Sequence, residues 1–141
     1  MKVQVAIDCA EPHRLVAFYA AAFGYEVEHH DAMIRGLLEQ GLVTDDDLVE
    51  IDGSLAFATA AACSDPAGDL PRLLFQQVPE GKVVKNRVHL DFQMGGAEAR
   101  EVAVERLLGL GATRLWDGQQ GPVHKWVTMA DPEGNELCVS D

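Results

Sequence analysis

The chain repeats one order of predicted elements, and this repeat restricts the folds that it can adopt. In each half, a strand is followed by an amphipathic helix and then by three strands. The helices are predicted over residues 12–23 and 97–110, each with a glycine just beyond its end. An Asp-Pro-x-Gly turn precedes the last strand in each half, at residues 65–68 and 131–134. We therefore expect an α+β fold of two βαβββ modules, each a curved mixed sheet with its helix on one side.

The repeat also defines the expected domain organisation. Strands are predicted over residues 3–8, 25–28, 55–61 and 72–78 in the first half, and over residues 87–93, 113–116, 125–130 and 135–139 in the second. Residues 1–141 are read as one domain, with a first module at residues 1–80 and a second at residues 83–141. Apolar residues at helical spacing from Met33, followed by a capped start at Thr44, predict a helical insertion over residues 33–53. A Gly-rich loop is expected after residue 116.

Charge and composition exclude several classes of partner. With 11 Lys and Arg against 23 Asp and Glu, the formal net charge is −12, which repels nucleic acid and anionic membranes. The N-terminal residues lack the apolar core of a signal peptide, no run is long enough to span a membrane, and a cytoplasmic location is expected. Three widely spaced cysteines suggest neither disulfides nor a paired-cysteine zinc site. A small molecule is the expected partner.

The segment KNRVHLDF, residues 85–92, is the first candidate for a functional site. Its apolar residues alternate with Arg87, His89 and Asp91, so a strand here would place a cation, an imidazole and a carboxylate on one face. Such a face is costly to bury without partners and useful in a cavity. The alternative is a half-exposed strand with a hydrated polar face.

Other predicted strands carry polar residues on the face away from the helices. Together these residues would line a concave polar surface with one aromatic wall: Gln4, Ala6, Asp8, Leu74, Gln76, Arg87, His89, Asp91, Gln93, Trp126, Thr128, Glu136 and Cys138. His29 and His30 are adjacent on a predicted strand and point to opposite faces, so we interpret them as surface residues.

The order of elements, together with FYAAAFGY, RVHLDF and DPEGNELCV, resembles the vicinal oxygen chelate superfamily. This superfamily includes glyoxalase I, extradiol dioxygenases and bleomycin-resistance proteins, and the resemblance is strongest to its glyoxalase-like subgroup. It covers nearly the entire chain and implies a cavity between the two modules. It also implies a homodimer, because relatives close the open side of each sheet with a partner chain.

The resemblance implies four metal-ligand positions on the first and last strands of the modules. They fall at Gln4, Gln76, His89 and Cys138. One imidazole, two amides and a thiol make a weak set for a hard divalent ion. Glu136 stands two residues before Cys138 on the same face, and with His89 and Gln4 it could hold zinc, nickel, iron or manganese.

Two functions follow from this resemblance. The first is a metal-dependent lyase, isomerase or dioxygenase in which Glu136 or Asp91 serves as the catalytic base, if the cavity raises its pKa toward neutrality. The second is a protein without a cofactor that sequesters a planar organic molecule, as bleomycin-resistance proteins do. In either case the residues expected to contact the ligand are Asp8, Gln76, Arg87 and Trp126.

Overall fold

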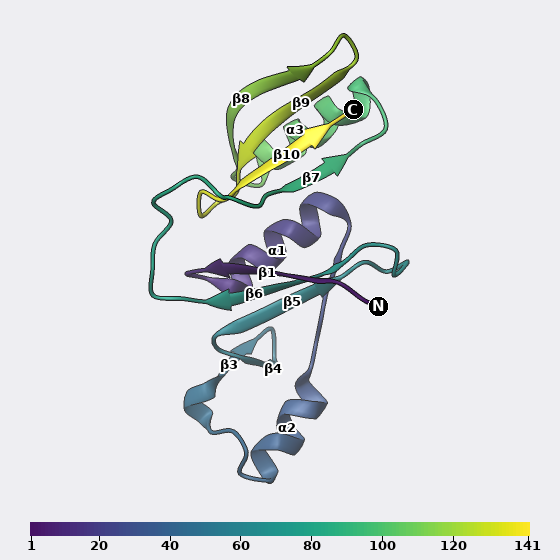
Figure 1. Ribbon diagram of the computed structural model, residues 1–141. Coiled ribbons are helices and arrows are strands. Elements are labelled where there is room, and N and C mark those ends of the chain that lie inside the picture. The colour runs from purple at the N-terminus through teal and green to yellow at the C-terminus, as the bar shows by residue number, and fades with distance from the viewer. The chain divides into compact units, whose positions relative to one another are not determined.

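The computed structural model describes all 141 residues and consists of two compact units, Met1–Glu80 and Gly81–Asp141. Each unit contains a four-stranded mixed sheet with a helix on one face (Figure 1). The prediction of an α+β fold built from two βαβββ modules is confirmed. No helix combines the length and the apolar character that crossing a membrane requires.

The sheet of the first unit has the strand order β1-β6-β5-β2. Its strands are β1 (Gln4–Cys9), β2 (Glu26–Val27), β5 (Ala60–Ser64) and β6 (Arg72–Gln77). Strand β1 runs parallel to β6, while β5 runs antiparallel to both β6 and β2. Helix α1 (Pro12–Phe23) begins at a proline, which needs no hydrogen-bond partner for its nitrogen, and ends before Gly24 at φ 75°. Its buried residues pack against Leu73 and Phe75 of the sheet.

The second unit repeats this topology with the strand order β7-β10-β9-β8. Its elements are β7 (Leu90–Gln93), α3 (Ala97–Gly109), β8 (Thr113–Gln120), β9 (His124–Ala130) and β10 (Glu136–Ser140). Strands β7 and β10 form the parallel pair that corresponds to β1 and β6. Val104 and Leu107 of α3 are fully buried, as are Met129, Leu137 and Val139 of the sheet.

The two Asp-Pro-x-Gly turns have matching hydrogen bonds, so the internal repeat includes the bonding pattern of these turns. In the first turn, Asp65 accepts a hydrogen bond from the N–H of Gly68 at its carbonyl and from the N–H of Ala67 at its side chain. In the second turn, Asp131 accepts in the same way from Gly134 and Glu133. An aspartate that bonds the backbone two residues on is the expected start of such a turn.

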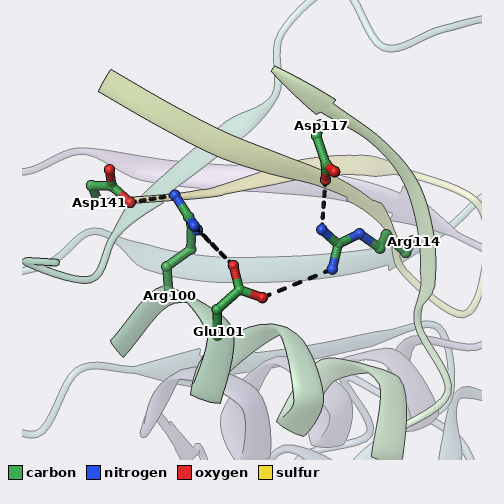
Figure 2. Close-up of polar contacts among 5 residues, drawn as sticks. All are labelled: Arg100, Glu101, Arg114, Asp117 and Asp141. Atoms are coloured by element: carbon green, nitrogen blue, oxygen red, sulfur yellow. Dashed lines mark hydrogen bonds and ion pairs between the residues drawn. The ribbon is translucent and has the colours of Figure 1, made fainter. Parts of the chain in front are cut away.

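A chain of ion pairs joins the helix of the second unit to its sheet (Figure 2). Arg100 of α3 pairs with both Glu101 and the C-terminal Asp141. Glu101 in turn approaches Arg114 of β8 at 3.9 Å, and Arg114 pairs with Asp117 at 2.7 Å. These ion pairs therefore connect α3 with β8 and with the residue that follows β10, at the rim of the apolar helix-sheet interface.

The segment between β2 and β5 differs from the predicted helical insertion. It contains α2 (Asp31–Glu39), one turn of 3-10 helix η1 (Asp45–Asp47), and a hairpin of β3 (Leu48–Ile51) and β4 (Ser54–Phe57). The strand predicted over residues 55–61 is therefore divided between β4 and β5. The sequence reading missed β3, because its alternation is too short to stand out beside the preceding run of aspartates.

Two further predictions of strand limits are corrected. The strand expected from residue 87 begins only at Leu90, and Val88, one of the alternating apolar residues of this segment, is 83% exposed. Strand β7 pairs with β10, which begins at Glu136, directly after a turn. The residues before β7 therefore have no strand beside them to pair with. The expected Gly-rich loop is instead the end of β8, which pairs with β9 as far as Gln120 and His124.

Candidate functional site

In the first unit, strand register places the predicted polar residues on one face of the sheet, away from α1. The parallel pairing of β1 and β6 sets Gln4 beside Arg72 and Asp8 beside Gln76. Gln4, Asp8 and Gln76 are all exposed. The side chain of Gln4 accepts a hydrogen bond from Arg72, so this predicted metal ligand already has a partner.

In the second unit, the corresponding face forms a cavity of about 320 Å³. The residues that line it alternate along the segment before β7 and along β7 to β10: Lys85, His89, Asp91, Trp116, Gln120, His124, Trp126, Thr128, Cys138 and Ser140. Five of them, His89, Asp91, Trp126, Thr128 and Cys138, were assigned to this face from the sequence. Arg87 does not line the cavity.

Three potential metal ligands meet in this cavity. The ligand atoms of His89, Asp91 and Cys138 all lie within 4.8 Å of one another. His89 donates a hydrogen bond from Nδ1 to Asp91 Oδ1 over 3.0 Å, and Cys138 Sγ lies 3.9 Å from the same nitrogen. Asp91 and Cys138 are in register on the parallel strands β7 and β10, and His89 lies two residues before Asp91. The sheet pairing therefore brings Asp91 and Cys138 together, and the hydrogen bond to Asp91 holds His89 beside them.

Cys138 is the buried member of the cluster, whereas His89 and Asp91 are exposed. Burial raises the pKa of the Cys138 thiol, and the nearby Asp91 carboxylate adds to this, so the thiol must lose a proton before it binds a metal. Thr128 Oγ1 lies 3.5 Å from the sulfur. Ser140, 3% exposed, also lines the cavity, and its Oγ has no hydrogen-bond partner. An unpaired buried hydroxyl is free to bind a ligand.

Glu136 is not part of the cluster, although the sequence placed it with His89. Its carboxylate binds Lys82 Nζ at 3.0 Å and accepts a hydrogen bond from the N–H of Asn86 at 2.9 Å. Burial alone would raise the pKa of Glu136, but the Asn86 and Lys82 contacts outweigh it and lower the pKa below its usual value. A catalytic base at neutral pH requires the opposite shift. The structure thus gives Glu136 a role in anchoring residues 82–86.

An aromatic wall bounds the second-unit cavity. The rings of His124 and Trp126 lie 5.5 Å apart, and Trp116 lines the same cavity. Trp126 lies over Gly118, its partner on β8, so closely that a Cβ at Gly118 would approach the indole ring to 2.1 Å. Gly118 is therefore required for this position of Trp126.

The sequence reading missed a network of charged residues in the first unit. Glu28, just after β2, accepts two hydrogen bonds of 2.8 Å from Arg72 and further ones from Ser64 and from His30. The Arg72 contact is the main reason why the pKa of Glu28 falls to about 2. Two oppositely charged residues on predicted strands were the available signal, but their pairing depends on a sheet order that connects β2 to β6 through β5.

The three-residue cluster fits a transition metal better than the ligand set expected from the sequence. An imidazole, a carboxylate and a thiol are ligand types that zinc accepts, and three protein ligands with an open position are typical of catalytic zinc sites. Nickel and iron accept related sets. The carboxylate in this cluster comes from Asp91, whereas the sequence reading expected it from Glu136.

Comparison with known proteins identifies the family of the chain. A model of the glyoxalase-like domain matches residues 4–140. A glyoxalase/bleomycin resistance protein/dioxygenase family enzyme from Burkholderia phytofirmans PsJN is 15% identical, with 97% of this chain and 94% of that chain covered and a TM-score of 0.66.

Two further solved structures are similar. Lactoylglutathione lyase from Agrobacterium tumefaciens is 13% identical, with 99% and 92% covered and a TM-score of 0.60. A mutant of the fosfomycin resistance protein FosX from Listeria monocytogenes, complexed with Mn(II) and 1S,2S-dihydroxypropylphosphonic acid, is 12% identical, with 96% and 85% covered and a TM-score of 0.61. At these identities the likeness shows the fold alone. No curated protein matches. Because the family model spans nearly the whole sequence, the chain belongs to the glyoxalase-like domain family of the vicinal oxygen chelate superfamily.

Proposed function

We propose that the protein binds a divalent transition metal through His89, Asp91 and Cys138 and holds a small organic molecule in the adjoining second-unit cavity. The observation that carries this proposal is the convergence of three ligand atoms within 4.8 Å on one wall of a cavity. The Mn(II) complex of the similarly folded FosX supports it, because a metal-binding cavity is compatible with this fold.

A three-residue ligand set leaves coordination positions for oxygens of the bound molecule. When bound there, the metal would act as a Lewis acid that polarises such oxygens. The protein supplies the surroundings: Ser140 Oγ is an unpaired hydrogen-bonding group, and Trp116 and Trp126 offer apolar ring faces in the same cavity. A lyase, isomerase or dioxygenase reaction is the class of chemistry that we propose for this arrangement.

Binding without a metal is the second candidate, favoured by the aromatic lining. Two tryptophans and two histidines, Trp116, Trp126, His89 and His124, line a cavity of only about 320 Å³. Such walls stack on planar molecules, which is how a sequestering protein would hold its ligand. Homodimer formation and a cytoplasmic location remain predictions from the sequence.

Metal content decides between the two candidates. The protein, purified without chelator or a histidine tag, is analysed by elemental mass spectrometry after incubation with zinc, nickel, ferrous or manganous ions and desalting. About one equivalent of metal per chain is expected in the wild type, and a loss of most of it in His89→Ala and Asp91→Ala.

The matched control is His124→Ala, which removes an imidazole from the same cavity but not from the cluster. It is expected to retain the metal. Glu136→Gln is expected to retain it as well, because the carboxylate of Glu136 binds Lys82 and Asn86. Absence of stoichiometric metal in the wild type would contradict the metal-dependent function and leave metal-free binding.

A further inference from the structure

We propose a second binding site, located in the first unit, for a neutral and largely apolar organic molecule that carries a hydrogen-bond donor. The site is a cavity of about 740 Å³ between the sheet and the segment that joins β2 to β5. Every residue that lines it belongs to Met1–Glu80, so this proposal is independent of the metal cluster in the second unit. Its volume lies within the range of cavities that hold drug-sized molecules, about 300–1,000 Å³.

The walls of the cavity are mainly apolar. They come from α1, α2, the β3–β4 hairpin and β6, and include Val16, Met33, Ile34, Leu55, Phe57 and Leu74. Ile34 is fully buried and Val16 is 2% exposed, whereas Met33 is 50% exposed. The cavity thus has buried apolar residues in its walls and one exposed flexible apolar side chain that a ligand can cover.

Hydrogen bonds hold the cavity open in the absence of a ligand. His13 of α1 bonds through Nε2 to the carbonyl oxygen of Phe57 over 2.8 Å, which fixes the hairpin to the helix. Asp31 of α2 accepts a hydrogen bond of 2.7 Å from the N–H of Leu55, which fixes α2 to the same hairpin. A preformed cavity avoids the cost of ordering its walls when a molecule binds.

The charges in the cavity disfavour an anion. Two carboxylates, Glu28 and Asp52, and one guanidinium, Arg72, line it. Glu28 and Arg72 neutralise each other through two hydrogen bonds of 2.8 Å, which leaves the negative charge of Asp52 and the net charge of −12 on the chain. An anionic ligand would therefore be repelled, and a neutral ligand would not.

Two histidines supply acceptors for a ligand donor. A carbonyl oxygen only accepts, so His13 donates to Phe57 from Nε2. His30 likewise donates from Nε2 to Glu28 over 3.1 Å, because the low pKa of Glu28 keeps that carboxylate ionised. In the neutral form of each imidazole, Nδ1 is then an acceptor. Both rings line the cavity. A hydroxyl or N–H group of a ligand can donate a hydrogen bond to Nδ1 of one of these rings.

A neutral fluorescent probe tests the site. N-phenyl-1-naphthylamine is apolar, carries one N–H donor and brightens when it leaves water. We expect saturable binding of one molecule per chain, displacement by 2-naphthol, and displacement by the anion 2-naphthoate that is at least about ten-fold weaker. Absence of saturable binding, or equal displacement by the two competitors, would overturn the proposal.

The location of the probe is read from the wild-type protein. The chain has four methionines, and of these only Met33 lines the first-unit cavity. With methyl-labelled methionine, addition of the probe is expected to shift the NMR signal of Met33, assigned by its loss in Met33→Leu. A shift at Met94 or Met129, with none at Met33, would place the probe elsewhere and disprove the site.

A pair of variants adds a matched comparison. Ala17 and Ala21 are both exposed on α1, but only Ala17 lines the cavity. Ala17→Trp is expected to weaken probe binding at least about ten-fold, and Ala21→Trp to leave it unchanged. His89→Ala should bind the probe normally, so failure of the metal proposal does not affect this result. Equal effects of the two tryptophan substitutions would overturn the assignment.

Discussion

The Glu28 carboxylate is hydrogen-bonded to three side chains of the first unit, and these contacts make stability depend on pH. Its pKa falls from 4.5 to about 2, chiefly through the hydrogen bonds from Arg72. A carboxylate with a lowered pKa stabilises the fold fully above its unfolded value, near pH 4.5, and loses this contribution as the pH falls toward 2. The shift corresponds to roughly 2 to 3 kcal/mol after allowance for solvent screening.

We therefore expect Glu28→Gln to lower the free energy of unfolding by about 2 to 3 kcal/mol near pH 7. The difference from wild type should shrink as the pH is lowered from about 5 to about 3. In this range Glu28 becomes protonated in the unfolded wild-type chain, which stabilises the unfolded state relative to the folded one. Urea unfolding followed by circular dichroism at several pH values measures both quantities.

Glu26→Gln is the matched control, because Glu26 lies only two residues before Glu28, on β2, but is exposed. It should change the free energy of unfolding by less than about 0.5 kcal/mol at every pH. A Glu28→Gln difference that stays constant with pH would show that the pKa of Glu28 is not lowered in the folded state.

The three potential metal ligands, His89, Asp91 and Cys138, show how far the positions of single residues can be predicted from the sequence. The alternation of KNRVHLDF predicted that His89 and Asp91 point the same way, and Cys138 was placed on that face. Glu136 lies outside the cluster. Its side chain shares the face with Cys138, but Lys82 and the N–H of Asn86 bind it. A contact with the backbone of a segment outside the sheet leaves no periodic signal in the sequence.

At the level of elements, the β8–β9 hairpin depends on one glycine. A Cβ at Gly118 would approach Trp126 to 2.1 Å, so Gly118→Ala must displace the indole ring. We expect a loss of stability of about 1–3 kcal/mol, as for other substitutions that overfill a packed site. Thermal unfolding measures this loss, and tryptophan fluorescence reports the displacement of the ring.

Gly109→Ala is the corresponding control. Gly109 ends α3, and a Cβ there meets nothing within 4 Å. Because alanine favours helices more than glycine does, this substitution should be neutral or stabilising by up to about 1 kcal/mol. A Gly118→Ala protein as stable as the wild type, with unchanged fluorescence, would contradict the close contact with Trp126.

Elements with a strong local pattern were predicted from the sequence, and elements defined by their partners were not. Helices α1 and α3 begin and end near the predicted residues, and both Asp-Pro-x-Gly turns form. Strand β7 is shorter than its alternation suggests, and β8 continues through a glycine, because each strand ends where its neighbour ends. Ladder partners lie far away in sequence, so local periodicity cannot set these limits.

At the scale of the whole molecule, the net charge of −12 opposes folding through self-repulsion. Exposed ion pairs such as Arg14–Glu11 and Arg35–Asp31 contribute little in comparison. Near pH 7, raising NaCl from about 20 mM to about 200 mM should therefore raise the midpoint of urea unfolding, because salt screens the repulsion.

The same salt increase at a pH near the isoelectric point of 4.6 provides the control. The net charge is then close to zero, and the midpoint should respond much less. If salt instead lowers the midpoint near pH 7, attractive ion pairs outweigh the overall repulsion, and the argument from net charge fails.

The cavity-forming segment of the first unit leaves and rejoins the sheet at neighbouring strands. Val27 of β2 is paired with Cys63 of β5, and the N–H of Glu28 bonds to Ala62. The gap that the segment closes therefore stays the same whatever its length, and the entropic cost of a longer loop rises only slowly. Loop-closure entropy therefore places little limit on the length of the segment over residues 29–59. Ligand preference in the first unit can consequently diverge between relatives faster than the fold that supports it.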